Sequence, residues 1–321
     1  MTNGNDATAA AAKLARAHTG RNVIATQGYH GWPDVWMAAS DRDAGIPPGL
    51  EAYTKSFAYN DLDSLERIFA AHPDDVAAVV MNPVGTTPPV DDFLQRVKDL
   101  AHREGAVLVF DEIITGFRFA PGGAQEYFDV VPDLACFAKA LANGMPLSCV
   151  TGRADVMRTM EDDDLVFSLT YGGEAASLAA ANAALEIHAT EPVAEHLFDL
   201  GARLRDVYNR IAADYDLADR TECTGYGPRT SIDFRDVDGE DEFDATLAES
   251  VFQQECLTRG ILYAGVQFVS YSHTEAEIDY TLEVYEEAMA EVRQGIDAGD
   301  LADRLDGRPI GAPVRDGSET F

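Results

Sequence analysis

The sequence predicts an α/β protein, built on a parallel sheet with helices on both faces. Two apolar runs, VAAVVM at 76–81 and AVLVF at 106–110, are unbroken rather than alternating. That pattern is typical of parallel strands buried on both faces. Helical patterns at 61–71 and 91–104 alternate with these runs, which indicates strands joined by crossover helices.

The segment ahead of this alternation is expected to add a helix and a strand. The alanine-rich run 6–18 begins at Asn5 and Asp6, so we predict a helix capped by one of these two side chains. A short strand is expected at 22–26. Residues 41–55 are rich in glycine and proline, which predicts a loop.

The rest of the chain is expected to complete this large domain at residue 191, then form a smaller α+β domain at 192–296 and a loosely held tail at 297–321. The expected elements are strands at 133–137, 148–151, 230–234 and 260–263, helices at 154–160, 192–215, 243–259 and 275–296, and a long alanine-rich helix ending at His188. Shorter strands between helices mark the change of domain.

Composition excludes several classes of partner. The chain has 321 residues, 46% of them hydrophobic, and a formal net charge of −32 from 56 acidic and 24 basic residues. Such a surface repels nucleic acid and anionic membranes. Few lysines beside this acidic excess indicate a halophilic protein in a salty cytoplasm, where screening weakens self-repulsion. The four scattered cysteines indicate no zinc site or disulfide framework, and neither a signal peptide nor a membrane span is visible, so we expect a cytoplasmic protein.

One lysine stands out in the stretch VPDLACFAKALANGMPLSCVTG at 131–152. Lys139 follows a strand-like run and precedes a glycine and proline turn, with apolar residues on both sides. Lysine is seldom left in apolar surroundings without a partner or a task. Desolvation would lower its pKa and let the neutral amine attack a carbonyl. A lysine reaching solvent from a strand end gives the same pattern, and on this stretch alone both interpretations stay open.

A carboxylate pair is predicted to lie at the same sheet edge as Lys139. Asp111 and Glu112 directly follow the run 106–110, and open α/β sheets bind ligands at the carboxyl ends of their strands. The strand at 133–137 brings Lys139 to that edge, so Asp111 and Lys139 are expected to converge. Capping of the next helix is an alternative role for a carboxylate at this position.

Two glycine-containing loops lead into helices and are candidate anion sites. They are Thr2-Asn3-Gly4-Asn5 and the Thr170 loop of FSLTYGG, since backbone N–H groups and the helix dipole favour anions there. An ordinary capped helix has the same appearance. The turn Tyr29-His30-Gly31-Trp32 has aromatic side chains that could stack on a planar ligand or form a plain surface turn.

Together, several of these motifs resemble one enzyme family. The order of TNGNDATAAAAKLARAHTGR, GYHGW, VLVFDEIITGFR, PDLACFAKALANGMPLSCVTG and FSLTYGGEAASLAAA is similar to that of class III pyridoxal-phosphate (PLP) aminotransferases, above all the glutamate-1-semialdehyde 2,1-aminomutase branch. The resemblance runs from Asn3 to about Ile296. It implies a fold-type I PLP-transferase large domain with a mixed, mostly parallel sheet, and a small C-terminal α+β domain.

The resemblance also implies a role for each site residue. Lys139 would hold pyridoxal 5'-phosphate as a Schiff base and then serve as base and acid, while Asp111 would face the pyridine nitrogen. The other implied cofactor-binding residues are Tyr29 and Ile113 on the ring faces, Gly4 and Asn5 at the phosphate, Thr170 at the phosphate from the other subunit, and His30 beside the stacking residue. The implied partners are an amino donor, an oxo acceptor and a second copy in a homodimer with shared sites.

The chain departs from the family at several positions. It is expected to lack the family's N-terminal part, through a misplaced start at Met1 or a truncated gene, which would leave Gly4 and Asn5 in a frayed terminus. Asn5 replaces a hydroxyl residue, Asn82 replaces a common glutamate, and YGGE replaces an SGNP-like run. Three interpretations stay open: an aminomutase-like enzyme, an aminotransferase for a sugar or another amino acid, and a catalytically impaired PLP-binding remnant or partner subunit.

Overall fold

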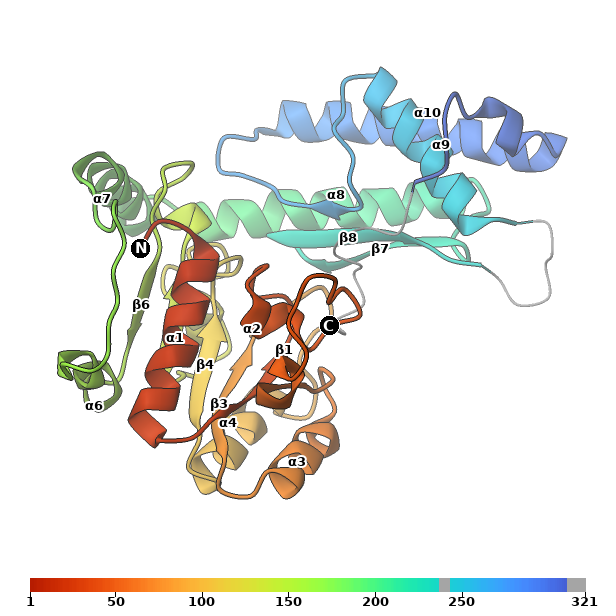
Figure 1. The fold of residues 1–321 in the computed structure, drawn as a ribbon. Helices are drawn as coiled ribbons and strands as arrows, with labels where there is room; N and C mark the ends of the chain where they lie inside the picture. The colour runs from red at the N-terminus through yellow and green to blue at the C-terminus, as the bar shows by residue number, and fades with distance from the viewer. Residues whose placement is uncertain (237–242, 311–321) are drawn as a thin grey trace. The chain divides into compact units, whose positions relative to one another are not determined.

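The computed structural model describes residues 1–236 and 243–310 (Figure 1). The chain forms two compact units, Met1–Pro192 and a second that begins at Val193. None of the helices in the described ranges combines the length and the hydropathy that a bilayer crossing requires.

The first unit is built on a six-stranded sheet. Its strands are β1 (Val23–Gln27), β2 (Thr54–Ser56), β3 (Val76–Met81), β4 (Val107–Asp111), β5 (Leu134–Phe137) and β6 (Cys149–Gly152), in the order β2-β1-β3-β4-β5-β6. Every neighbouring pair is parallel except β5 and β6, which are antiparallel. The predicted α/β class with a mixed, mostly parallel sheet is therefore confirmed.

Helices cover both faces of this sheet. They are α1 (Gly4–Thr19), α2 (Asp34–Met37), α3 (Leu62–Ala71), α4 (Phe93–Arg103), α5 (Ala124–Tyr127), α6 (Ala154–Met157) and α7 (Ala175–Thr190), with short 3-10 helices η1 (Leu50–Tyr53), η2 (Lys139–Leu141) and η3 (Arg158–Glu161). Successive strand residues point to opposite faces. Val80 and Val109 pack with the alanines of α1 on one face, whereas Val79 and Leu108 pack with α3 and α4 on the other (Figure 1).

The start of α1 differs from its prediction. Asn3 is the N-cap: its side chain accepts the Asp6 N–H, and the Asp6 carboxylate accepts the Asn3 N–H, which forms a reciprocal capping box. Ser148 Oγ donates to the Asn3 carbonyl at 2.6 Å, and Ser148 N donates to the Met1 carbonyl at 2.8 Å. The expected caps at Asn5 and Asp6 and the expected fraying of Gly4 and Asn5 are therefore wrong.

The remaining differences in this unit are local. The predicted loop 41–55 contains η1 and ends in β2, a short edge strand. The predicted helix 154–160 is a single turn, α6, continued by η3. At α7, the Glu174 side chain is the N-cap and accepts the N–H groups of Ala176 and Ser177 at 2.8 and 2.6 Å. The helix N-terminus predicted to receive an anion thus already has a carboxylate from its own chain.

The second unit is a small antiparallel sheet with three long helices. Its elements are α8 (Val193–Asp214), β7 (Thr221–Tyr226), β8 (Arg229–Phe234), α9 (Ala245–Thr258), β9 (Val266–Gln267), α10 (Glu275–Ala298) and the 3-10 helix η4 (Leu301–Arg304). The sheet order is β7-β8-β9. Its core includes the buried rings of Tyr208, Phe252 and Tyr285, which contact one another at centroid distances of 5.3–5.9 Å.

Two predictions for this unit are wrong. Residues 260–263 form no strand; the chain turns at Gly260, which has a φ of +83°, and pairs only later, in β9. The predicted loose tail begins in the last turn of α10 and continues into η4, where Arg304 bonds Asp300 and Glu291, each at 2.7 Å. Residues 311–321 of that tail lie outside the described residues.

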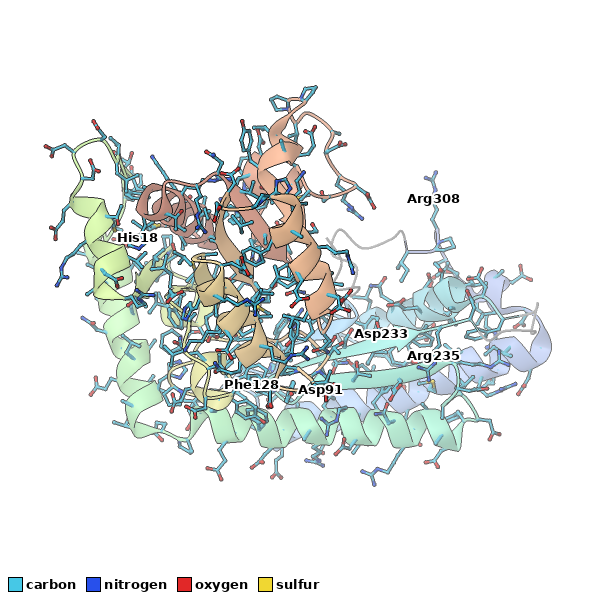
Figure 2. The ribbon with its side chains drawn as sticks, turned by 90° about the horizontal axis from the view of Figure 1, so that it is seen from below. His18, Asp91, Phe128, Asp233, Arg235 and Arg308 are labelled. Carbon is cyan, nitrogen blue, oxygen red and sulfur yellow. The ribbon has the colours of Figure 1, made fainter. Side chains whose placement is uncertain are left out.

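The buried carboxylate of Asp133 joins three segments by hydrogen bonds at the amino-terminal edge of the large sheet. Asp133 accepts hydrogen bonds from Arg153 Nη1 at 2.8 Å, Leu108 N at 2.8 Å and His102 Nε2 at 3.0 Å. Burial alone would raise the pKa of Asp133, but these three donors outweigh burial and hold the pKa below its usual value. A pocket of about 470 Å³ adjoins this cluster and is lined in part by His18. Figure 2 labels this residue, which lies in the last turn of α1.

We predict that Asp133→Asn destabilises the first unit. Because the folded pKa lies below the unfolded one, the carboxylate contributes fully above its ordinary pKa of about 3.9, and its contribution is lost as the pH falls through the folded value. We expect the variant to lose about 1–3 kcal/mol in the free energy of unfolding at pH 7. The difference between variant and parent should become smaller below about pH 4. Urea unfolding followed by tryptophan fluorescence measures this unit, since both tryptophans, Trp32 and Trp36, belong to it.

Asp155→Asn is the matched control, because it removes an exposed carboxylate that binds the same Arg153. It should change unfolding little. An Asp133→Asn variant whose deficit persists unchanged into acid would contradict the prediction.

Candidate active site

The two residues expected at the heart of the site do share one sheet edge. Asp111 is the last residue of β4 and pairs with Cys136 on the parallel strand β5. Lys139 begins η2, directly after the carboxyl end of β5. Parallel neighbouring strands end at the same edge, so topology brings the carboxylate and the amine together.

Lys139 has an unusual backbone. Its φ is +46°, in the left-handed region, which costs a residue with a side chain roughly 1–2 kcal/mol. Such conformations concentrate at functional sites, where the surrounding structure holds them in place. The side chain is exposed in this chain, which contradicts the desolvation expected from its apolar flanks, because the backbone leaves the sheet at Ala138 and turns Lys139 outward.

Asp111 is buried, and both of its carboxylate oxygens accept hydrogen bonds. Oδ2 lies 2.7 Å from His30 Nδ1, and Oδ1 accepts from Ile113 N at 3.1 Å. The exposed fraction of the side chain is 3% for Asp111 and 1% for His30. This carboxylate is held in a fixed orientation by groups from two different segments.

The N-terminus of α1 reaches the same place. A Cβ on Gly4 would lie 2.8 Å from Ile113 Cδ1, and a Cβ on Gly31 would lie 2.4 Å from Asn5 Cβ. Glycine is thus needed at position 31, whereas a side chain at position 4 would require the end of the Ile113 side chain to shift. Within the described residues, the N–H groups of Gly4 and Asn5 have no acceptor, so they can bind an anion.

The remaining predicted residues differ in how well they are placed. Tyr29 is half-buried and stands directly before His30, at the same sheet edge. Thr170 is exposed, in the irregular segment ahead of α7, and forms no hydrogen bond with another residue of the described ranges. The structure therefore brings together Gly4, Asn5, His30, Asp111 and Ile113 by direct contacts, and leaves Thr170 apart.

Glu112 follows Asp111 directly but has a different role. It is fully buried, and its carboxylate accepts from Ala124 N at 2.9 Å, Gln125 N at 2.7 Å and Thr115 Oγ1. Burial raises the pKa of Glu112, and these hydrogen bonds oppose that rise. The carboxylate caps α5 and so fixes the loop that follows Ile113. The alternative of helix capping, considered for the Asp111-Glu112 pair, applies to Glu112.

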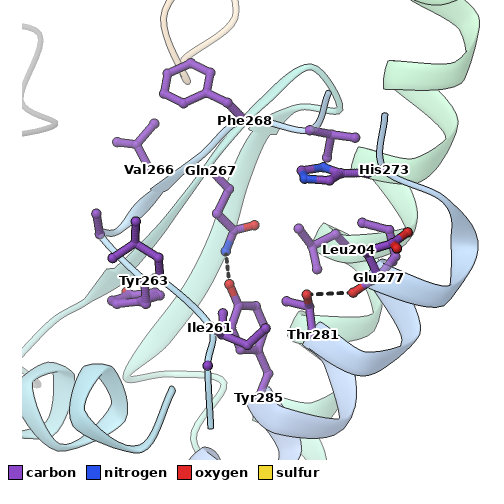
Figure 3. A pocket seen from close by; sticks show the side chains of 15 residues that line it. Leu204, Ile261, Tyr263, Val266, Gln267, Phe268, His273, Glu277, Thr281 and Tyr285 are labelled. Carbon is purple, nitrogen blue, oxygen red and sulfur yellow. Dashed lines mark hydrogen bonds between the residues drawn. The ribbon is translucent and has the colours of Figure 1, made fainter. Parts of the chain in front are cut away.

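A separate pocket lies in the second unit (Figure 3). Its volume is about 300 Å³. Gln267 Nε2 donates to Tyr285 OH at 3.0 Å, and Thr281 Oγ1 donates to the Glu277 carbonyl at 2.7 Å, so these polar groups bind one another. Neither this pocket nor the one beside Asp133 includes Lys139 or Asp111. The candidate site is therefore assigned to the carboxyl ends of β4 and β5 rather than to either pocket.

The family is decided by comparison with known sequences. The family described as Aminotransferase class-III matches residues 1–288. The chain belongs to the class-III aminotransferases. This is a family of PLP-dependent aminotransferases and aminomutases, and the resemblance found in the sequence is thereby confirmed.

Individual relatives of this class-III aminotransferase have two different curated activities. It is 34% identical to a glutamate-1-semialdehyde 2,1-aminomutase of Halobacterium salinarum, over 90% of this chain and 75% of that protein. It is 31% identical to a 3-aminobutyryl-CoA aminotransferase of Cloacimonas acidaminovorans, over 91% and 70%. The PLP internal aldimine form of the Sphingopyxis sp. MTA144 FumI protein is 28% identical, with a TM-score of 0.83, over 93% of this chain and 71% of that one.

Proposed function

We propose that this class-III aminotransferase transfers amino groups with pyridoxal 5'-phosphate, in the manner of glutamate-1-semialdehyde 2,1-aminomutase. The observation that carries this proposal is that Asp111 ends β4 and Lys139 follows the end of the neighbouring strand β5, at the sheet edge where the N-terminus of α1 also lies. Family membership and PLP-bound structural neighbours imply the cofactor.

The residues at this edge suit the cofactor. The unpaired N–H groups of Gly4 and Asn5 fit a phosphate, and the Asp111 carboxylate fits a protonated pyridine nitrogen. Lys139 would hold the cofactor through a Schiff base at Nζ. Bound PLP supplies an electron sink for the charge left when a proton is removed next to the amino group.

The chain's own groups would carry the proton steps and orient the ring. Lys139 Nζ, as a free amine, would take the proton from the substrate carbon as a base, and the resulting ammonium would then donate that proton as an acid. Tyr29 and Ile113 would lie on the two faces of the ring, and His30 would stand behind Asp111. Thr170, exposed in one chain, would contact the phosphate of the partner's site.

A second candidate is transamination of a sugar or another amino acid. Glu174 caps α7 in this chain, within the YGGE run that departs from the aminomutase pattern, which supports a different substrate pocket. The 3-aminobutyryl-CoA aminotransferase among the relatives also supports this alternative. The third candidate is a PLP-binding remnant or partner subunit that does not catalyse amino transfer.

Purified protein with added PLP distinguishes these candidates. We expect an absorption band of the bound cofactor that borohydride treatment abolishes. The reduced cofactor should then be attached covalently to the peptide that contains Lys139. Glutamate 1-semialdehyde should then be converted, and an alternative amino donor should bleach the band if the second candidate is right. A band that no donor bleaches would leave only the remnant. Because the net charge is −32, the assay should be run across a range of KCl concentrations, as expected for a halophilic cytoplasmic enzyme.

We also propose a homodimer that packs through α7. The helix has Leu178 and Leu185 seven residues apart on one face, and their exposed fractions are 45% and 39%. Exposed apolar positions on a helix beside the Thr170 segment favour a second copy of this chain as the occupant.

We predict that the double variant Leu178→Glu/Leu185→Glu is a monomer. Each leucine should bury enough apolar surface in the dimer that losing both, and burying charge instead, weakens association by at least about 100-fold. Light scattering across a dilution series measures the mass. Val131→Glu is the control, because Val131 is 58% exposed and lies outside α7. A monomeric parent, or a dimeric double variant, would contradict this interface.

A further inference from the structure

The ring of His30 lies behind Asp111 and is nearly inaccessible. His30 follows the end of β1, Asp111 ends β4, and β3 lies between the two strands. The 2.7 Å contact between His30 Nδ1 and Asp111 Oδ2 therefore joins segments 81 residues apart. With an exposed side-chain fraction of 1%, His30 has a polar ring in the interior, where a ring nitrogen that donates a hydrogen bond needs an acceptor.

Three neighbours hold His30 in place. Its carbonyl oxygen accepts from Thr8 Oγ1 of α1 at 2.7 Å. The Trp36 ring packs on it edge-on, with centroids 5.1 Å apart. Gly31, the next residue, has a φ of +123° and lies against Asn5. These contacts leave the imidazole little freedom to turn away from Asp111.

The second ring nitrogen decides the protonation state. His30 Nε2 is buried and has no hydrogen-bond partner among the described residues. A proton on Nε2 would leave an unpaired N–H donor in the interior, which is costly. If Nδ1 were protonated as well, the imidazole ring would also carry a buried positive charge. An unprotonated Nε2 leaves only an unused lone pair. Nδ1–H is then the donor that Asp111 Oδ2 accepts.

We propose that His30 is a positioning residue for Asp111, as the neutral Nδ1–H tautomer, and that it does not itself touch the cofactor. His30 Nδ1–H and Ile113 N–H each donate a hydrogen bond to one oxygen of the Asp111 carboxylate. The carboxylate therefore keeps one orientation toward the place of the cofactor's pyridine nitrogen. This inference rests on the proposed function, and it replaces direct cofactor contact, implied by the resemblance, as the role of His30.

Three variants of the full chain test the positioning. Asn at position 30 can present its amide N–H near the place of Nδ1, Gln presents it farther out, and Phe keeps the ring without a donor. We expect His30→Asn to retain PLP affinity within about threefold, and His30→Gln and His30→Phe to weaken it by about 10- to 100-fold, the worth of a hydrogen bond to a charged group. PLP titration by quenching of tryptophan fluorescence measures the affinity. Equal affinity for His30→Phe and the parent, or for Asn and Gln, would overturn the proposal.

A second measurement needs no cofactor. Nitrogen-15 NMR of the histidine-labelled parent, with the His30 signals assigned by their loss in His30→Asn, should show a protonated Nδ1 and an unprotonated Nε2. A protonated Nε2 would overturn the assignment whatever the affinities are. If the parent binds no PLP while the tautomer is as expected, the proposed function fails and the bond between His30 and Asp111 stands.

Discussion

Replacing Lys139 by alanine is expected to abolish both covalent cofactor capture and amino transfer. The variant loses the amine that holds the cofactor and the base that moves the proton, so the rate should fall by at least about 10²–10⁴-fold, the range that one general acid–base group contributes. The initial rate of amino transfer at saturating PLP measures the loss of activity. Intact mass after borohydride treatment measures covalent capture, since only a covalently attached cofactor is retained.

The small number of lysines makes this experiment unusually clean. The chain has only three others, Lys13, Lys55 and Lys98. A triple variant with arginine at these positions should still retain one reduced cofactor per chain, and Lys139→Ala should retain none. If Lys139→Ala is labelled as fully as the parent, the lysine at the end of β5 is not the anchor.

Asp111→Asn is expected to keep the shape of the site while removing its charge. The amide can still accept from Ile113 N, but it cannot offer a carboxylate to His30 Nδ1–H and to the ring nitrogen at once. Removing one preorganised electrostatic contact usually costs about 10²–10³-fold in rate. We therefore expect kcat to fall by that factor with PLP still bound.

Rate and occupancy must be measured on the same sample. The absorption of bound PLP gives the occupancy, so a lower rate at full occupancy isolates the charge of Asp111. Asp63→Asn, an exposed position in the first turn of α3, controls for the loss of one negative charge. An Asp111→Asn enzyme within a few-fold of the parent would show that this carboxylate has no electrostatic role in the reaction.

Much of the first unit could be predicted from sequence because its signals are local. The unbroken runs that became β3 and β4 have a pattern that few alternatives share, and β3 has the predicted bounds. The start of α1 was missed for a local reason too. The Asn3-x-x-Asp6 spacing is a capping box, and it outweighs the alternative caps two and three residues later.

The second unit was harder to predict because its strands are weakly marked. β7 has the sequence TECTGY, with polar residues and a glycine, so it lacks a clear apolar alternation. ILY at 261–263 has the composition of a strand but no neighbouring strand to pair with. Strand pairing is decided by tertiary contacts, which composition does not contain.

The shared sheet edge of Asp111 and Lys139 could be predicted, but the contacts around Asp111 could not. The carboxyl ends of β4 and β5 could be placed from topology, and the family motifs supplied the other residues. The bond between His30 and Asp111 depends on the register of three strands, and no local pattern predicts it. The exposure of Lys139 depends on a left-handed backbone in a residue with no turn-forming preference.

The tie between Ser148 and Asn3 has a consequence for the order of folding. It spans 145 residues, yet the entropy of closing a flexible loop grows only with the logarithm of its length. Contacts of such long sequence separation generally form late, after the strands between them have paired. Capture of PLP should therefore report the finished first unit rather than an intermediate. A ligand that binds only the native state at about a hundredfold excess over its Kd adds roughly 2.7 kcal/mol to the stability of that state, so bound PLP would stabilise the finished first unit.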